Sequence, residues 1–157
     1  MRHIDRTGLV VFALTGFGWA WTPVNPQNLK PNPRLGNAIV AAAGPIANLL
    51  LAILLSIPLR MHLNLPPDVN RLLLVGFILN IVLFCLNLIP LPPLDGFTVM
   101  MGILPRPLAA RLKLLEKYGP GLLLVLLLFL PWVLHIDILG GIVNPVARLV
   151  LGARLGF

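Results

Sequence analysis

The feature that most constrains this chain is a set of three long apolar stretches that contain no Asp, Glu, Lys or Arg. They run from about residue 37 to 59, from 72 to 90 and from 119 to 135. A helix of about 20 mostly apolar residues crosses about 30 Å of bilayer hydrocarbon, and each stretch reaches or comes close to that length. The sequence therefore predicts an all-α polytopic membrane helix bundle with about three spanning helices.

The composition excludes several other classes of protein. Hydrophobic residues make up 58% of the 157 residues and charged residues 11%, with a mean hydropathy of +0.94. Such a chain has too few polar groups for the surface of a water-soluble domain. Its apolar content excludes disorder, and its single cysteine excludes a disulfide scaffold. That cysteine, Cys85, lies mid-helix without a neighbouring histidine, and we interpret it as a buried, inert thiol.

The chain carries a net charge of +7, and its basic residues are distributed as in a membrane protein. The segments before, between and after the apolar stretches carry four, two, four and two basic residues in turn. Because cytoplasmic segments are enriched in Lys and Arg, the first and third segments are expected inside the cell. This alternation fits a membrane topology better than a groove for the phosphates of a nucleic acid, so we expect no nucleic-acid partner.

A single membrane domain is expected, with three parts. Residues 1–36 form an interfacial or re-entrant segment anchored by Trp19 and Trp21, which is favoured over a signal peptide. Residues 37–118 hold two spanning helices and a basic cytoplasmic segment with a short interfacial helix at 111–117. Residues 119–157 form a hydrophobic tail. Beyond Asp137 the pattern leaves two interpretations open, an interfacial helix or a weak fourth span.

Asp95 is the strongest candidate functional residue, because an ionisable side chain near membrane depth is costly and is usually retained for a task. It follows three prolines that end the second apolar stretch, and Gly96 lets the chain turn beside it. Irregular backbone close to the membrane is tolerated where it lines a cavity. The alternative interpretation is an Asp-Gly turn in which Asp95 only caps a short helix over residues 97–104.

Two motifs in order resemble the site-2 protease family, the intramembrane zinc metalloproteases. The run Asn87-x-x-Pro90-x-x-Pro93-Leu94-Asp95-Gly96 is similar to the family's Asn-Pro…Leu-Asp-Gly signature, and Gly44-Pro45-Ile46-Ala47-Asn48 resembles its Gly-Pro-x-x-Asn element. The segments from His3 to Arg34 also resemble the stretch that follows the zinc helix in bacterial members. The resemblance covers about residues 1–104 and, with the compact form of the chain, suggests a multi-pass protein of a bacterial inner or plasma membrane.

The resemblance implies a zinc ion held by two histidines of a His-Glu-x-x-His helix and by the aspartate of Leu-Asp-Gly, with a water in the fourth position. It also implies a membrane-protein substrate whose spanning helix is unwound and cut within the bilayer. Asp95 matches the third zinc ligand, and Asn48 and Asn87 match positions that contact the substrate. The remaining motif positions are scaffold: Gly44, Pro45, Pro90, Pro93, Leu94 and Gly96.

The chain departs from the family because it contains no His-Glu-x-x-His. Its one glutamate is Glu116, and no two of His3, His62 and His135 are four residues apart, so no catalytic residue can be identified. We therefore expect a family member that starts after its zinc helix and is inactive as this chain alone. A longer reading frame or a complementing polypeptide would supply that helix.

Two further functions remain open on the sequence. One is a metal-free pseudoprotease that binds single-span membrane proteins around Asn48 and Asn87. The other is a membrane scaffold or small transporter subunit with Asp95 as a polar pathway residue.

Overall fold

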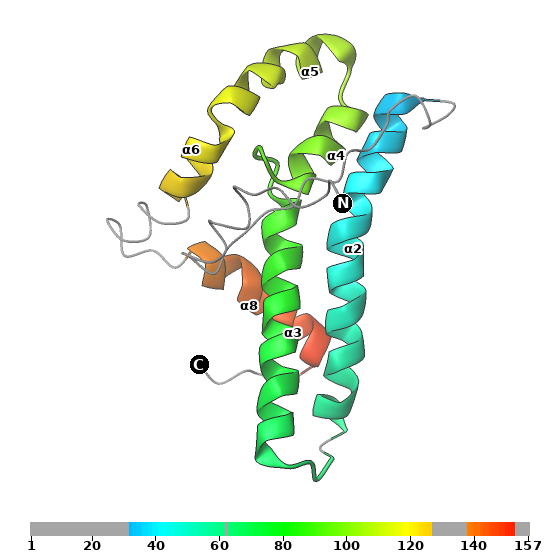
Figure 1. Cartoon of the computed structure of the whole chain (residues 1–157), viewed down its shortest axis with the longest axis vertical. Helices are drawn as coiled ribbons and strands as arrows, with labels where there is room; N and C mark the ends of the chain where they lie inside the picture. Colours follow the sequence, from blue (N-terminus) through cyan, green and yellow to red (C-terminus); the bar gives the residue numbers. More distant parts are fainter. Residues whose placement is uncertain (1–31, 62, 127–137, 153–157) are drawn as a thin grey trace, which may run out of the picture.

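The computed structural model describes residues 32–61, 63–126 and 138–152, and these residues confirm the predicted all-α class (Figure 1). No strand occurs among them. The expected segment 1–36 lies almost wholly outside the described residues. The described elements are α2 (Pro33–Arg60), α3 (Pro67–Leu88), α4 (Asp95–Ile103), α5 (Arg106–Leu112), the 3-10 helix η2 (Lys113–Lys117), α6 (Gly119–Leu124) and α8 (Ile138–Leu151).

Helices α2 and α3 are long and apolar enough to cross a membrane, and they lie side by side in opposite directions (Figure 1). Their 28 and 22 residues correspond to about 42 and 33 Å at about 1.5 Å per residue. Large apolar side chains such as Leu54 and Leu72 remain 61% and 73% exposed, as expected for helices that contact lipid. These two helices correspond to the first two predicted spans.

Both helices begin four or five residues before the predicted starts, because a proline opens each one. Pro33 and Pro67 lie in the first turn, where the missing N–H would have no partner within the helix. Asn32 caps α2, since its side-chain oxygen accepts hydrogen bonds from the backbone N–H groups of Arg34 (3.1 Å) and Leu35 (3.4 Å).

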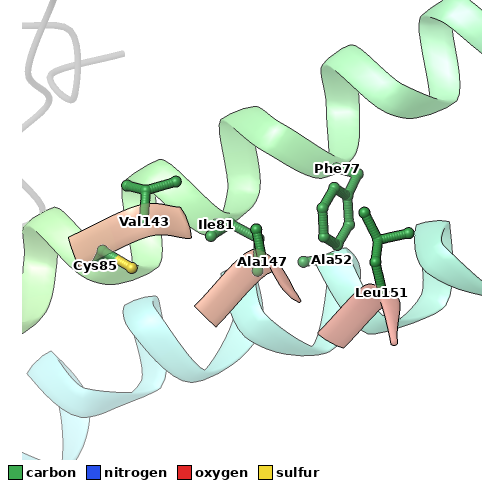
Figure 2. Packing of buried hydrophobic residues seen from close by; sticks show 7 residues of the cluster. All are labelled: Ala52, Phe77, Ile81, Cys85, Val143, Ala147 and Leu151. Carbon is green, nitrogen blue, oxygen red and sulfur yellow. The ribbon is translucent and has the colours of Figure 1, made fainter. Parts of the chain in front are cut away.

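The core lies where α8 crosses the α2–α3 pair (Figure 2). Phe77, Ile81 and Cys85 of α3 line one side of this cluster, and Cys85 is buried as predicted. The other members come from the two neighbouring helices: Ala52 of α2 and Val143, Ala147 and Leu151 of α8. The 14 residues of α8 cover about 21 Å, less than the about 30 Å of a bilayer core, so this described part of the tail is not a complete fourth span.

Arg60, the last residue of α2, fixes the end of α8. Its Nη2 donates hydrogen bonds to the carbonyl oxygens of Val150 and Leu149, the latter at 3.5 Å. A cation at these carbonyls complements the negative end of the helix dipole. Gly152 follows with φ +64° and ends the helix in the left-handed conformation that favours glycine.

The segment after α4 differs in part from its prediction. The short helix expected over residues 111–117 starts earlier, at Arg106, and changes to 3-10 geometry at Lys113. The six-residue helix α6 begins at Gly119, where the third span is predicted to begin, and that span stays a prediction. The remainder of that stretch, residues 127–135, lies outside the described residues.

Candidate metal and substrate site

A tight turn between α3 and α4 positions Asp95. The helix α3 ends at Leu88, where the prolines at 90, 92 and 93 prevent its continuation. Gly96 then packs against the end of α3, because a Cβ at this position would lie 2.5 Å from the carbonyl oxygen of Leu88 and 2.7 Å from that of Ile89. Only glycine permits this approach, so Gly96 fixes the start of α4 on the end of α3.

Asp95 is the first residue of α4 and does not cap it. The N-cap is Leu94, and no side chain makes a capping hydrogen bond. The interpretation of Asp95 as a helix cap is therefore wrong. Its Oδ2 instead lies against α2, 2.9 Å from the position that a Cβ of Gly44 would occupy. The structure thus brings the Leu-Asp-Gly and Gly-Pro-x-x-Asn motifs into direct contact.

The Asp95 carboxylate lies well along α2, away from its end. Gly44 is the twelfth residue of α2, about 17 Å from the start of the helix. From there α4 runs back toward the start of α2, where Arg34 Nη2 donates a hydrogen bond of 2.9 Å to the carbonyl oxygen of Leu104. The Asp95 side chain is half-buried at this position. Among the described residues no donor hydrogen-bonds this carboxylate, which leaves its oxygens available to a ligand.

Asn48 and Asn87 lie close to this level of the bundle. Asn48 follows Gly44 by one helical turn and so shares its face of α2. Gly76 of α3 packs on Leu55 of α2. Asn87 follows Gly76 along α3 by the same number of residues by which Gly44 precedes Leu55 along α2, so in this antiparallel pair Asn87 lies near the level of Gly44. Both amides are half-buried, and neither hydrogen-bonds another described residue. Their contact with a substrate stays a prediction.

The scaffold positions differ in how they are used. Pro45 is fully buried beside Gly44, and Leu94 is half-buried. Pro90 and Pro93 are exposed and act as helix breakers in the turn.

Sequence reasoning missed two glycines that hold the same region together. A Cβ at Gly102 would lie 2.3 Å from the Cβ of Ala38, so Gly102 lets α4 pack closely on α2. A Cβ at Gly119 would lie 2.4 Å from the carbonyl oxygen of Pro92, so Gly119 seats the start of α6 on the turn before Asp95. The available signal was a glycine within or beside an apolar stretch, which in membrane helices often marks a close approach.

The described residues do not form a zinc site by themselves. Zinc sites use three or four protein ligands, and no group of three or more His, Cys, Asp or Glu side chains gathers within the described part of the chain. His3, His62 and His135 all lie outside the described residues. Asp95 is therefore at most one ligand here, and its role as a metal ligand stays a prediction.

A comparison with curated proteins gives a relative in Bacillus subtilis (strain 168), named "Putative zinc metalloprotease YwhC". It is 34% identical over 135 residues, which cover 80% of this chain. This similarity relates most of the chain to a protein that is named as a zinc metalloprotease. The match confirms the family relationship that the two motifs predicted. The chain spans 61% of that relative's length. No family model and no solved structure matches the chain.

Proposed function

We propose that this chain provides the carboxylate-bearing and substrate-contacting part of a site-2-type intramembrane zinc protease. The observation that carries the proposal is the contact between the Asp95 carboxylate and Gly44, well inside the length of α2. A carboxylate that neither caps its helix nor hydrogen-bonds a described residue is suited to bind a metal ion. The relationship to a zinc metalloprotease supports zinc as that metal.

The two asparagines give the proposal its substrate side. A substrate helix unwound in the bilayer exposes backbone N–H and C=O groups, and leaving them without partners in hydrocarbon costs several kcal/mol each. An amide side chain offers both donors and an acceptor. Asn48 and Asn87, close to the level of Asp95, would stabilise the unwound backbone beside the metal ligand.

The two histidines and the glutamate of the zinc helix come, in this proposal, from outside the 157 residues. They are supplied by further sequence of the same polypeptide or by a second one. The protein is then a multi-pass protein of the bacterial inner membrane with the α4–α5 end in the cytoplasm. Zinc, once bound, would lower the pKa of its water ligand. The chain alone is expected to lack protease activity.

Metal analysis tests this proposal directly. The detergent-solubilised chain and its Asp95→Ala variant would be purified alone and after co-expression with the part of the Bacillus subtilis relative that lies outside its match to this chain, and zinc per chain would be measured. We expect no bound zinc in either chain alone. Co-expression should give near-stoichiometric zinc with the parent chain and much less with Asp95→Ala.

Three results would contradict the proposal. Near-stoichiometric zinc in the chain alone, lost in Asp95→Ala, would mean that His3, His62 or His135 completes a site within these 157 residues. Equal zinc in the two co-expressed proteins would mean that Asp95 is not a ligand. Absence of bound zinc in the co-expressed parent chain would also contradict it and would favour the metal-free pseudoprotease.

A further inference from the structure

A second site lies at the opposite end of α4 from Asp95. A pocket of about 490 Å³ opens between the start of α2, α4 and the α5–η2 segment. Arg34, Arg106 and Lys113 contribute three positive charges to its lining, and Glu116 contributes the single negative charge. The rest of the lining is mostly apolar, with Phe97 and Met101 beside the uncharged polar Asn37 and Thr98, and Asp95 is not part of it. The pocket is therefore both basic and apolar.

The positive charges of this pocket are not neutralised by the described part of the protein. Arg106 and Lys113 are exposed, and no ion pair joins either of them to a described residue. Arg34 uses Nη2 to donate to the carbonyl oxygens of Met101 and Leu104, which holds its guanidinium at the pocket and leaves its other N–H groups free among the described residues. An anion would gain charge-assisted hydrogen bonds here.

The elements around the pocket place it at the level of lipid headgroups. Arg34 lies in the first turn of α2, the end of a helix long enough to span the bilayer. The α5–η2 segment exposes Leu108 (47%) and Leu114 (74%) among its basic side chains, as interfacial helices do. A soluble anion needs no such apolar surroundings, whereas a phospholipid presents a phosphate with apolar carbons attached.

We propose that this pocket binds the phosphate of an anionic phospholipid headgroup. Arg34 and Arg106 would each present a planar guanidinium to the phosphate oxygens, and Lys113 a point charge. Phe97 and Met101 would contact the first carbons of the lipid. This end of the bundle is richer in basic residues than the α2–α3 turn, which fits the leaflet in which anionic lipids are abundant. The binding needs neither zinc nor proteolysis.

Lipid titration of the purified full chain in neutral detergent tests the proposal. The probes are a short-chain phosphatidylglycerol, the phosphatidylcholine with the same acyl chains, and inorganic phosphate, each followed by calorimetry. The test variant is Arg106→Gln with Lys113→Gln. The control is Arg111→Gln with Lys117→Gln, which removes the same charge from the same two elements at exposed positions that do not line the pocket.

We expect phosphatidylglycerol to bind at least about tenfold more tightly than phosphatidylcholine or inorganic phosphate, because each basic residue near an anionic surface adds to the affinity. The test variant should lose at least about tenfold in affinity and the control less than about threefold. Glu116→Gln should bind more tightly than the parent chain. Helix content by circular dichroism confirms that each variant is folded.

Three results would overturn the proposal. Equal losses in the test and control variants would show a diffuse surface-charge effect without a pocket. Equal affinity for inorganic phosphate would identify a free phosphate as the ligand, and equal affinity for phosphatidylcholine would show that the lipid charge is not recognised. None of these results bears on the role of Asp95, so this proposal and the protease proposal fail independently.

Discussion

The contact between Asp95 and Gly44 makes the substitution Gly44→Ala a sharp test of the site. The added methyl group would lie 2.9 Å from Asp95 Oδ2, closer than a carbon and an oxygen approach each other without a bond. The neighbour is the end of a side chain, so the carboxylate is expected to rotate away while both helices stay in place. The substitution should therefore move the candidate ligand and leave the fold intact.

The expected stability change is small because two effects oppose each other. Alanine is favoured over glycine inside a helix by about 0.8–1.0 kcal/mol. Forcing the Asp95 side chain about 30° from its rotamer costs about 0.5–1.5 kcal/mol. We therefore expect the free energy of unfolding of the chain alone to change by less than about 1 kcal/mol. In the zinc-loaded, co-expressed protein, displacing a ligand should weaken zinc binding by about 10–100-fold, as the loss of a ligand's supporting contact does.

A double-mutant cycle isolates the clash. Unfolding of detergent-solubilised protein would be followed for Gly44→Ala, Asp95→Ala and the combined variant, with Gly141→Ala in α8 as the matched control. A Cβ at Gly141 meets no atom of the described residues within 4 Å, so that variant reports the helix-propensity gain alone. When Asp95 is already replaced by alanine, Gly44→Ala should stabilise the protein about as much as Gly141→Ala does. The coupling energy between positions 44 and 95 is then expected to be about 0.5–1.5 kcal/mol.

Additive effects in this cycle would refute the reasoning, because they would mean that the methyl group does not meet the carboxylate. A loss of more than about 2 kcal/mol in Gly44→Ala alone would also refute it, since a cost of that size indicates overpacking against the bundle itself.

Two further predictions follow from other close contacts. Gly102→Ala should lower the free energy of unfolding by about 1–3 kcal/mol, because its methyl group would meet the Cβ of Ala38 at 2.3 Å and the carbonyl oxygen of Arg34 at 3.0 Å. Denaturant unfolding measures this loss, and a neutral effect would contradict the packing of α4 on α2. Arg60→Gln should increase amide hydrogen exchange in the last turn of α8 and destabilise the protein by up to about 1 kcal/mol, because the exposed guanidinium no longer binds the terminal carbonyls. Unchanged exchange at residues 148–151 would show that this contact is not stabilising.

The length of the uncharged stretches predicted α2 and α3 because bilayer thickness fixes the length of a spanning helix. It misjudged where they begin, because Arg34 is the second residue of α2 and Arg71 the fifth residue of α3. Each charge bounds the uncharged stretch, although the helix begins before it. A charge at a membrane boundary is solvated and does not end a helix. Pro33 and Pro67 fit the observed starts, because a proline breaks a helix in its middle but is tolerated in its first turn.

The candidate site was predictable in its residues but not in its geometry. Asp95 was predicted as a functional residue because it is a carboxylate after three prolines, and the family resemblance identified Gly44. The sequence around either residue does not indicate that the two are in contact. Contact between positions so far apart in sequence depends on how α4 folds back along α2. The packing of α4 on α2 rests on Gly102, and the turn before α4 packs on Gly119. In the sequence alone, these two glycines are indistinguishable from glycines that only permit a turn.

The position of the Asp95 carboxylate is set by close backbone packing at both ends of α4. Hydrophobic association is weak between helices in lipid, so small residues that allow close approach take its place. Gly96 holds the start of α4 on the carbonyl groups that end α3, and Gly102 holds its last turn on Ala38 of α2. Since α4 cannot slide along α2 without breaking both contacts, the carboxylate keeps its place beside Gly44 without a hydrogen bond from any described residue. A ligand held in this way retains its oxygens for the metal, which is why we expect the glycines around Asp95, more than its polar neighbours, to decide whether a zinc ion can bind.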